Sequence, residues 1–395
     1  MILGIVFGVV ISVVNTRLLG PEVYGDYKFI HSVYSFFTIV IGFGFLQSVG
    51  KMLAEKKNEA LRKELIGSSV LITVMMGCVF AVIMLIFAVF QKHFFPTDLS
   101  GVILMLTPVL FFVPFNKYFE NVFQGDNKIY ELAIFRQLPQ LMYLVSVIIM
   151  AKFGWLNLIS ALYAQLTAFI LVEAVLLVRL KPYFKNLKKN IKYIYEDTKT
   201  YGFHVYLGTL FGVASTSFAP VVLSYFSDSN VSVGYFSLAI TVTAPLMMIP
   251  SVVGTTMFKE FANSPKIPAK ATYATLGSSL VTLLLFLLII KPVIIFLYTD
   301  KFIDVVPLAY IVSIAQILHG YGNYYNRFLG AHGLGKKLRN GAFLVGISNL
   351  AGFVFLVPAF GAYGAAFTKL SSGLVFVVSM YIYYIYYTRS NKFKA

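Results

Sequence analysis

The sequence predicts an all-α integral membrane protein with about twelve transmembrane helices, arranged as two parallel six-helix bundles around a central cavity. Two observations support this fold class. Hydrophobic residues make up 58% of the chain and charged residues only 12%, whereas a soluble domain usually carries about 25% charged residues. In addition, the basic residues are unevenly distributed between the apolar stretches, which predicts how the chain is oriented in a bilayer.

Basic residues gather in alternate connections. Of the 32 lysines and arginines, 22 lie in six polar segments. These segments are 51–64, 123–131, 179–199, 259–274, 330–339 and 389–395. The six intervening connections hold only four basic residues, Arg17, Lys92, Lys152 and Lys301. Because basic residues are retained on the cytoplasmic side of a membrane, this alternation predicts a multi-pass protein with both termini in the cytoplasm.

Each apolar stretch is expected to form a helix, because hydrocarbon offers no hydrogen bonds to the backbone and a crossing needs about 20 residues. The first stretch is apolar from Met1 and is expected to be a span instead of a cleaved signal peptide. Prolines such as Pro108 and Pro114 predict bent helices. The predicted spans are 1–16, 27–50, 66–90, 101–122, 132–151, 155–180, 202–226, 232–258, 275–298, 305–329, 340–358 and 362–388.

The longest polar connection, 181–201, divides the chain into bundles 1–180 and 202–388, followed by a tail at 389–395. Its basic, amphipathic character fits either a helix lying on the inner membrane surface or a solvated linker. Three motifs recur in the same order on either side of it, which predicts an internal repeat and a cavity between the two bundles. The pairs are Gly4-x-x-x-Gly8 with Gly208-x-x-x-Gly212, Asn121-x-Phe123-x-Gly125 with Asn326-x-Phe328-x-Gly330, and Phe153-Gly154 with Phe360-Gly361.

Several classes of protein are excluded by what the sequence lacks. It contains no Walker, HExxH or GxSxG motif, so an enzyme is not expected. The five histidines have no metal-ligand spacing and Cys78 is the only cysteine, so neither a metal nor another cofactor is expected. The net charge of +16 is interpreted as a topology signal facing anionic lipid, not as a nucleic-acid surface.

Ionisable residues inside spans are costly and usually face an internal cavity. The cations are Lys28, Lys117, Arg136, Lys291, Arg327 and Lys369, and the acids are Glu120, Glu131 and Glu173. Some have simpler explanations. Lys28, Arg136 and Lys291 could extend toward a span end, Glu131 is close to the interface, and Lys117 could be neutralised by Glu120 three residues later.

Lys369 and Glu173 are the two charges that lie deepest, each well inside the last span of its half. We expect Lys369 to face the cavity. Glu173 either pairs with a cation in the cavity or simply pairs with a neighbouring helix. The two roles have different consequences, since only a cavity-facing carboxyl could couple transport to an ion.

The span 305–329 carries the densest set of polar residues, and most of them share one helical face. They are Gln316, His319, Asn323, Asn326 and Arg327. The equivalent span of the first half carries Asn116, Asn121 and Gln124. These faces could form two walls of a hydrated cavity, or they could hold helices together through hydrogen bonds.

Three stretches resemble the polysaccharide-biosynthesis flippases, the Wzx-type O-antigen transporters. The first is Arg17-Leu18-Leu19-Gly20-Pro21 with Tyr24-Gly25, the second is FQGDNKIYE at 123–131, and the third is FGAYGAAFTKL at 360–370. The resemblance implies a fold like that of multidrug and toxic-compound exporters and of lipid II flippases. However, the chain has no charge between His31 and Lys51, and this argues against a lipid II flippase.

The resemblance also implies a function. A polyprenyl-diphosphate-linked oligosaccharide, such as an O-antigen, capsule or exopolysaccharide repeat unit, would be moved from the inner to the outer leaflet of the bacterial cytoplasmic membrane by alternating access. The diphosphate would bind the cationic side chains and the sugars would bind the amides, with two carboxyls as candidates for ion coupling. The cations are Lys28, Lys117, Arg327 and Lys369, the amides Asn323, Asn326 and Gln316, and the carboxyls Glu173 and Glu120.

Two other functions remain open at this stage. A cation-coupled exporter of drugs would have the same fold, but its cavity should be acidic, whereas the spans carry more cations than acids. A scaffolding protein of a glycan-assembly complex would need no charge in mid-span. The expected partners are the lipid-linked oligosaccharide and membrane lipid, together with a glycan polymerase or glycosyltransferase, and not nucleic acid.

Overall fold

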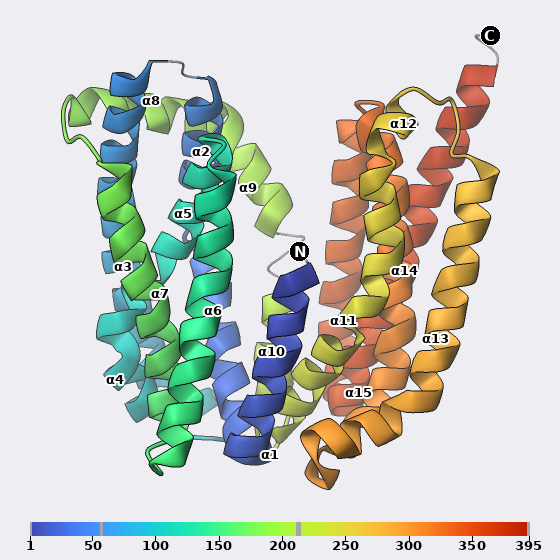
Figure 1. Cartoon of the computed structure of the whole chain (residues 1–395), viewed down its shortest axis with the longest axis horizontal. Coiled ribbons are helices and arrows are strands. Elements are labelled where there is room, and N and C mark those ends of the chain that lie inside the picture. Colours follow the sequence, from blue (N-terminus) through green and yellow to red (C-terminus); the bar gives the residue numbers. More distant parts are fainter. Residues whose placement is uncertain (1, 56–57, 211–214, 393–395) are drawn as a thin grey trace. The chain divides into compact units, whose positions relative to one another are not determined.

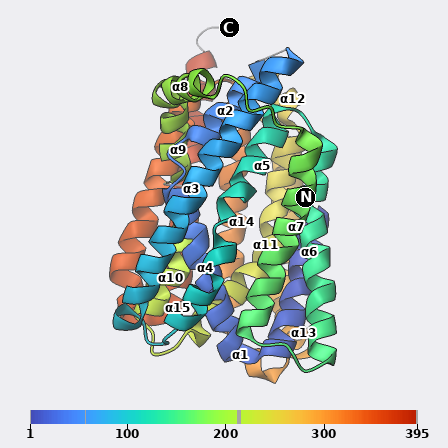
Figure 2. The same cartoon turned by 90° about the vertical axis from the view of Figure 1, so that its left-hand side faces the viewer.

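The computed structural model describes residues 2–55, 58–210 and 215–392, and it divides the chain into two compact units, Met1–Phe218 and Ala219–Ala395. Both units are built from helices (Figures 1 and 2). The predicted all-α membrane class is confirmed, because nine helices in the described residues are long and apolar enough to cross a bilayer. Two of them, α1 and α15, are kinked and hold two predicted spans each.

The first unit contains the helices that correspond to the first six predicted spans, to the connection after them and to the start of the seventh span. They are α1 (Ile2–Val40), α2 (Phe45–Glu55), α3 (Glu59–Phe94), α4 (Ser100–Leu110), α5 (Val113–Gly125), α6 (Ile129–Lys152), α7 (Leu158–Leu180), α8 (Leu187–Asp197), a π-helical turn (Thr198–Gly202) and α9 (Phe203–Thr209). Helix α10 (Ser215–Tyr225) carries the chain across the boundary between the units.

The second unit contains the remaining helices. They are α11 (Val231–Thr256), α12 (Phe258–Ala262), α13 (Ala269–Tyr298), a 3₁₀ turn (Asp300–Phe302), α14 (Val305–Ala331) and α15 (Gly335–Lys392). Helix α14 packs extensively against both α11 and α15. Helix α14, which carries the predicted polar face, is therefore the central element of this unit. The cavity expected between the two bundles stays a prediction.

Two glycines explain how α1 and α15 turn within a continuous helix. Gly20 has φ 74° and Gly361 has φ 53°, a backbone conformation that only glycine adopts without strain. Pro21 follows Gly20 as the first residue of the next helical segment, where its missing N–H costs nothing. Gly154 (φ 71°), the repeat counterpart of Gly361, is also left-handed. The match between the two Phe-Gly pairs therefore extends to backbone conformation, while Gly212 lies outside the described residues.

Two predicted spans are broken in the structure, and only the second of them contains prolines from which a bend was expected. The span 27–50 is interrupted at 41–44, where Phe43 and Gly44 have φ of 43° and 87°. The span 101–122 is interrupted at 111–112, between α4 and α5. Pro114 at the start of α5 accounts for the second break, because proline cannot supply the N–H of a continuous helix.

The connection 181–201 forms helix α8, which lies across one end of the first unit (Figures 1 and 2). Lys51 Nζ donates to Asp197 Oδ1 at 2.6 Å, and Asn190 Nδ2 donates to Glu64 Oε2 at 3.3 Å. A Cβ on Gly202 would lie 2.3 Å from the carbonyl oxygen of Gly44, so the connection also packs tightly at the break in the second span. The helical alternative is confirmed, and its contact with the membrane stays a prediction.

Candidate functional site

A polar face on α1 runs through the interior of the first unit. Tyr24, Lys28 and His31 follow one another at spacings of four and three, so they share one side of the helix. Lys28 is half-buried, and its Nζ lies 5.4 Å from the centroid of the Tyr24 ring. The His31 ring lies 4.8 Å from the ring of Tyr34. Aromatic faces attract cations, so the tyrosine steadies the ammonium without neutralising it.

One short hydrogen bond and two weaker contacts join this face to the neighbouring helices. Tyr143 Oη on α6 donates to Asn15 Oδ1 on α1 at 2.9 Å, and both residues are buried. The Tyr143 ring also stacks on Tyr27, with 6.4 Å between centroids. Tyr34 Oη contacts Gln165 Oε1 on α7 at 3.4 Å. These contacts tie α1 to α6 and α7, and within the described part of the chain no carboxylate lies within salt-bridge distance of Lys28.

Lys117 differs from Lys28 because it is already paired. Its Nζ lies 2.8 Å from Glu120 Oε2, and Arg136 Nη2 lies 3.5 Å from Glu120 Oε1. The side chain of Lys117 is 48% exposed and that of Glu120 is 30% exposed. The pairing considered from the three-residue spacing is therefore present. One carboxylate shared by two cations still leaves a net positive charge at the end of α5.

Glu173 on α7 is buried, with 4% of its surface exposed. Neither of its carboxylate oxygens has a hydrogen-bond partner among the described residues. The alternative in which Glu173 pairs with a neighbouring helix is thus not observed. An ionised carboxyl without partners is expensive in an apolar interior, so a change of its protonation would be tied to a change of its surroundings.

The polar face of α14 makes contacts with both helices that flank it. Gln316 Nε2 approaches the carbonyl oxygen of Ile240 at 3.5 Å, and Asn323 Nδ2 approaches Ser251 Oγ at 3.4 Å, both on α11. Asn326 Nδ2 lies 3.9 Å from Met380 Sδ on α15. These distances are long for hydrogen bonds. The amides therefore keep most of their capacity to bind another polar partner.

The two cations of the second unit lie on different helices. Arg327 is exposed on α14, and its stem lies beside Gly254 of α11, where an added Cβ would be 3.5 Å from Arg327 Cβ. Lys369 is half-buried on α15, one turn before Ser372. Ser372 Oγ lies 3.3 Å from His319 Nε2 on α14. Lys369 and the α14 face therefore belong to the same helix pair.

Of the predicted residues of the first unit, the structure joins Lys117 and Glu120 and adds Arg136 to them, but no contact links Lys28 to this group among the described residues. It also adds residues that the sequence analysis missed. Tyr24 places its ring beside the Lys28 ammonium, and Tyr34 packs against His31 on the same face. Asn15 and Tyr143 join α1 to α6. The signal that could have identified Tyr24 was its place four residues before Lys28. Among the described residues, no group of three His, Cys, Asp or Glu side chains could hold a metal ion.

Comparison with known proteins gives a consistent result. A family model described as "Polysaccharide biosynthesis protein" matches residues 1–262. Among solved structures, lipid II flippase MurJ in an inward closed conformation superposes with a TM-score of 0.80 and 15% identity, over 96% of this chain and 85% of that one. An inward-facing multidrug resistance MATE family transporter of the MOP superfamily gives 0.67 and 13%, over 96% and 95%.

A third similar structure is a MOP superfamily transporter from Pyrococcus furiosus, with a TM-score of 0.61 and 13% identity, over 98% of this chain and 94% of that one. No curated protein matches the chain in sequence. At these identities the solved structures show the fold, which is the one implied by the resemblance in the sequence.

Proposed function

This chain belongs to the polysaccharide biosynthesis protein family, and we propose that it is the flippase for a polyprenyl-diphosphate-linked oligosaccharide. The substrate would move from the inner to the outer leaflet of the membrane by alternating access. The chain would supply no bond-making chemistry and would not act as an enzyme. The similarity of its fold to that of a lipid II flippase supports this proposal, since lipid II flippases also move a lipid-linked glycan.

The observation that carries the proposal is Lys28, an ammonium inside an apolar bundle with no carboxylate within reach in the described residues. A cation in such a position is costly unless an anion joins it. A diphosphate provides that anion and forms strong, charge-assisted hydrogen bonds. Lys117, Arg327 and Lys369 would add positive charge along the path, although Lys117 must share Glu120 with Arg136.

The amides of α14 would bind the sugars. Gln316, Asn323 and Asn326 make only long contacts with α11 and α15, so replacing those contacts with sugar hydroxyls would cost little. We propose that the segments 1–180 and 202–388 are the moving halves. Helix α8 packs on the first unit through Asn190 and Glu64 and would move with it.

The setting of the protein follows from its charge pattern. We propose a bacterial cytoplasmic membrane as its location, with both termini in the cytoplasm, because alternate connections hold most of the basic residues. A glycan polymerase or glycosyltransferase would be its partner, since a flippase receives a completed repeat unit and delivers it for polymerisation.

The test measures leaflet distribution of the lipid-linked glycan in cells that carry only a chosen variant. We expect Lys28→Ala to lower the rate of transfer by about ten- to hundredfold, the range given by losing one hydrogen bond to a charged group. Lys28→Arg should retain much of the activity. Deletion of the gene should leave full-length lipid-linked repeat units in the inner leaflet and remove surface polymer.

Lys291→Ala is the matched control, because Lys291 is also a lysine in a predicted span but is exposed on α13. It should leave transfer unchanged. Normal surface glycan after gene deletion, or equal transfer by Lys28→Ala and Lys291→Ala at equal protein levels, would refute the proposal.

A cation-coupled exporter is the second candidate, and Glu173 is the observation that favours it, because a buried carboxyl without partners suits ion coupling. In a flippase the same residue would couple glycan transfer to the ion. We expect Glu173→Gln to reduce glycan transfer about tenfold and to abolish its response to dissipating the proton gradient. Unchanged glycan transfer with altered resistance to cationic drugs would favour the exporter instead.

A further inference from the structure

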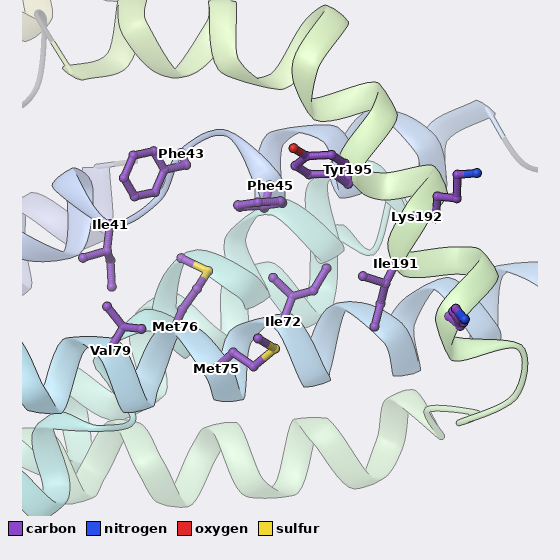
Figure 3. Close-up of a pocket in the computed structure, with 11 residues that line it drawn as sticks. Ile41, Phe43, Phe45, Ile72, Met75, Met76, Val79, Ile191, Lys192 and Tyr195 are labelled. Atoms are coloured by element: carbon purple, nitrogen blue, oxygen red, sulfur yellow. The ribbon is translucent and has the colours of Figure 1, made fainter.

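A cavity of about 810 Å³ lies in the first unit between α3 and the connecting helix α8 (Figure 3). Its floor is formed by Ile72, Met75, Met76 and Val79 of α3. The break in the second span forms one side, and α8 covers it from above. The volume is in the range of small-molecule sites, about 300–1,000 Å³, but the lining side chains are almost entirely apolar.

The floor of this groove is part of an exposed apolar stripe. Met75 and Val79 are 61% and 53% exposed, and the stripe continues along α3 through Val82 and Ile86. Residues at spacings of three and four lie on one side of a helix. In a membrane-spanning helix such a stripe faces hydrocarbon, so the groove opens toward the region that lipid chains occupy.

The break in the second span shapes the opposite wall. Phe43 has a left-handed backbone conformation (φ 43°) and is 51% exposed. Its ring lies 5.8 Å from the ring of Tyr206 on α9. Phe45 also lines the groove. A continuous helix would place these side chains differently, so the break holds the two phenylalanines beside the apolar groove.

Two lysines stand at the rim. Lys188 and Lys192 are one turn apart on α8, both are exposed, and both line the groove. Figure 3 shows Lys192 extending from α8 above Ile191. Among the described residues, the one carboxylate within salt-bridge distance of this pair is Glu196, whose Oε1 lies 3.9 Å from Lys192 Nζ, and the two side chains are 59% and 77% exposed. Such exposed pairs contribute little, so the ammonium groups remain available to an anion.

We propose that this groove binds an anionic glycerophospholipid, with an acyl chain along the floor on α3 and the phosphate between Lys188 and Lys192. The apolar groove matches the acyl chain of such a lipid, and the cations at its rim match the phosphate. The position at the cytoplasmic end of the span, as the basic connections predict, is also where anionic headgroups attract basic residues.

A bilayer phospholipid fits better than the polyprenyl tail of the transported glycan. The cationic residues at the rim are on α8, a helix that lies across the end of the first unit, and not on the polar face of α1 that carries Lys28. The inference therefore does not depend on the proposed function. It assigns to α8 a role as a lipid-binding element that couples the connecting segment to the surrounding membrane.

The test uses tryptophan fluorescence, because the chain has a single tryptophan, Trp155. A Trp155→Phe, Val79→Trp variant is reconstituted in bilayers that contain brominated phosphatidylglycerol or brominated phosphatidylcholine, since bromine quenches a tryptophan that it contacts. Each lysine near a membrane surface changes binding of anionic lipid roughly fivefold, so a preference of about five- to thirtyfold for phosphatidylglycerol is expected at position 79.

Two matched controls separate a site from general attraction. Val89→Trp places the reporter on the same helix, where Val89 is 57% exposed but does not line the groove, and it should show no preference. Lys188→Ala with Lys192→Ala should remove the preference at position 79, whereas Lys185→Ala with Lys189→Ala, which removes equal charge from the same segment, should retain it.

Three results would overturn the proposal. The first is equal quenching by both lipids at position 79. The second is an equal loss of the preference for phosphatidylglycerol in the two double-lysine variants. The third is displacement of the brominated lipid by a long polyprenyl phosphate but not by unbrominated phosphatidylglycerol. The last would identify the groove as a site for the substrate tail, and it would leave the flippase proposal itself intact.

Discussion

Each unit has one helix with a polar face inside it, α1 in the first and α14 in the second, but the two faces are built differently. On α1, the buried pair Asn15 and Tyr143 makes a 2.9 Å hydrogen bond, and the Tyr143 ring stacks on Tyr27, the residue before Lys28. On α14, Asn323 reaches its partner Ser251 only at 3.4 Å. The first face is fixed by its own bonds around a free cation, whereas the second holds amides that are incompletely bonded.

This difference suggests that the two faces bind different parts of the substrate. A diphosphate is compact and highly charged, so a site for it benefits from a cation whose surroundings do not move. Sugars vary in stereochemistry and present many hydroxyls, so a face of amides with unused hydrogen-bonding capacity can adapt to them. The charge on α1 also differs from that on α5, because Lys117 shares Glu120 with Arg136 while Lys28 has no carboxylate within salt-bridge distance among the described residues.

The largest stability effect is expected on α1. Asn15→Ala removes the acceptor of the buried Tyr143 hydroxyl and should destabilise the protein by about 1–2 kcal/mol, near the upper limit for hydrogen bonds between membrane helices. Unfolding in detergent would measure it. In a double-mutant cycle with Tyr143→Phe, the coupling should be most of that value. A coupling near zero would mean that the α1 face is no more rigid than the α14 face.

Hydropathy and charge alone predicted a large part of the fold, because the cost of placing polar backbone and lysines in hydrocarbon dominates the sequence. The break at 41–44 was missed, whereas Pro114 had indicated a bend near the break at 111–112. Gly42 and Gly44 on either side of Phe43 could have indicated this break, but the left-handed conformation of Phe43 itself depends on packing that hydropathy does not report. The sequence predicted the polar connection 181–201 but did not distinguish a helix from a solvated linker there, and the structure has helix α8.

The candidate site shows the same limit. Lys28 stood out as a charge within a span, whereas Tyr24, Tyr34 and Tyr143 counted toward the apolar content and were not distinguished from core residues. Which partner a tyrosine hydroxyl finds depends on helix rotation in three dimensions. Similarly, the sequence could not tell that Glu120 is shared by Lys117 and Arg136 while Glu173 has no partner among the described residues.

A smaller effect on stability is expected on α14, where glycan binding and protein stability should respond differently to the same substitution. Asn323→Ala should change the free energy of unfolding by less than about 0.5 kcal/mol, below the average for hydrogen bonds between membrane helices, because its 3.4 Å contact with Ser251 is weak. The same variant should lower glycan transfer about fivefold, since one hydrogen bond to a sugar is worth roughly 1 kcal/mol. Unfolding and leaflet transfer are measured on the same variant.

Ser251→Ala provides the control for this prediction, because it removes the protein partner of Asn323 and leaves the amide in place. If Asn323 is held for the glycan, Ser251→Ala should leave transfer near its original rate. If transfer falls equally in both variants while stability falls with it, the 3.4 Å contact is a structural bond after all. The α14 face would then be a helix interface like that of α1, and the sugars would have to bind elsewhere.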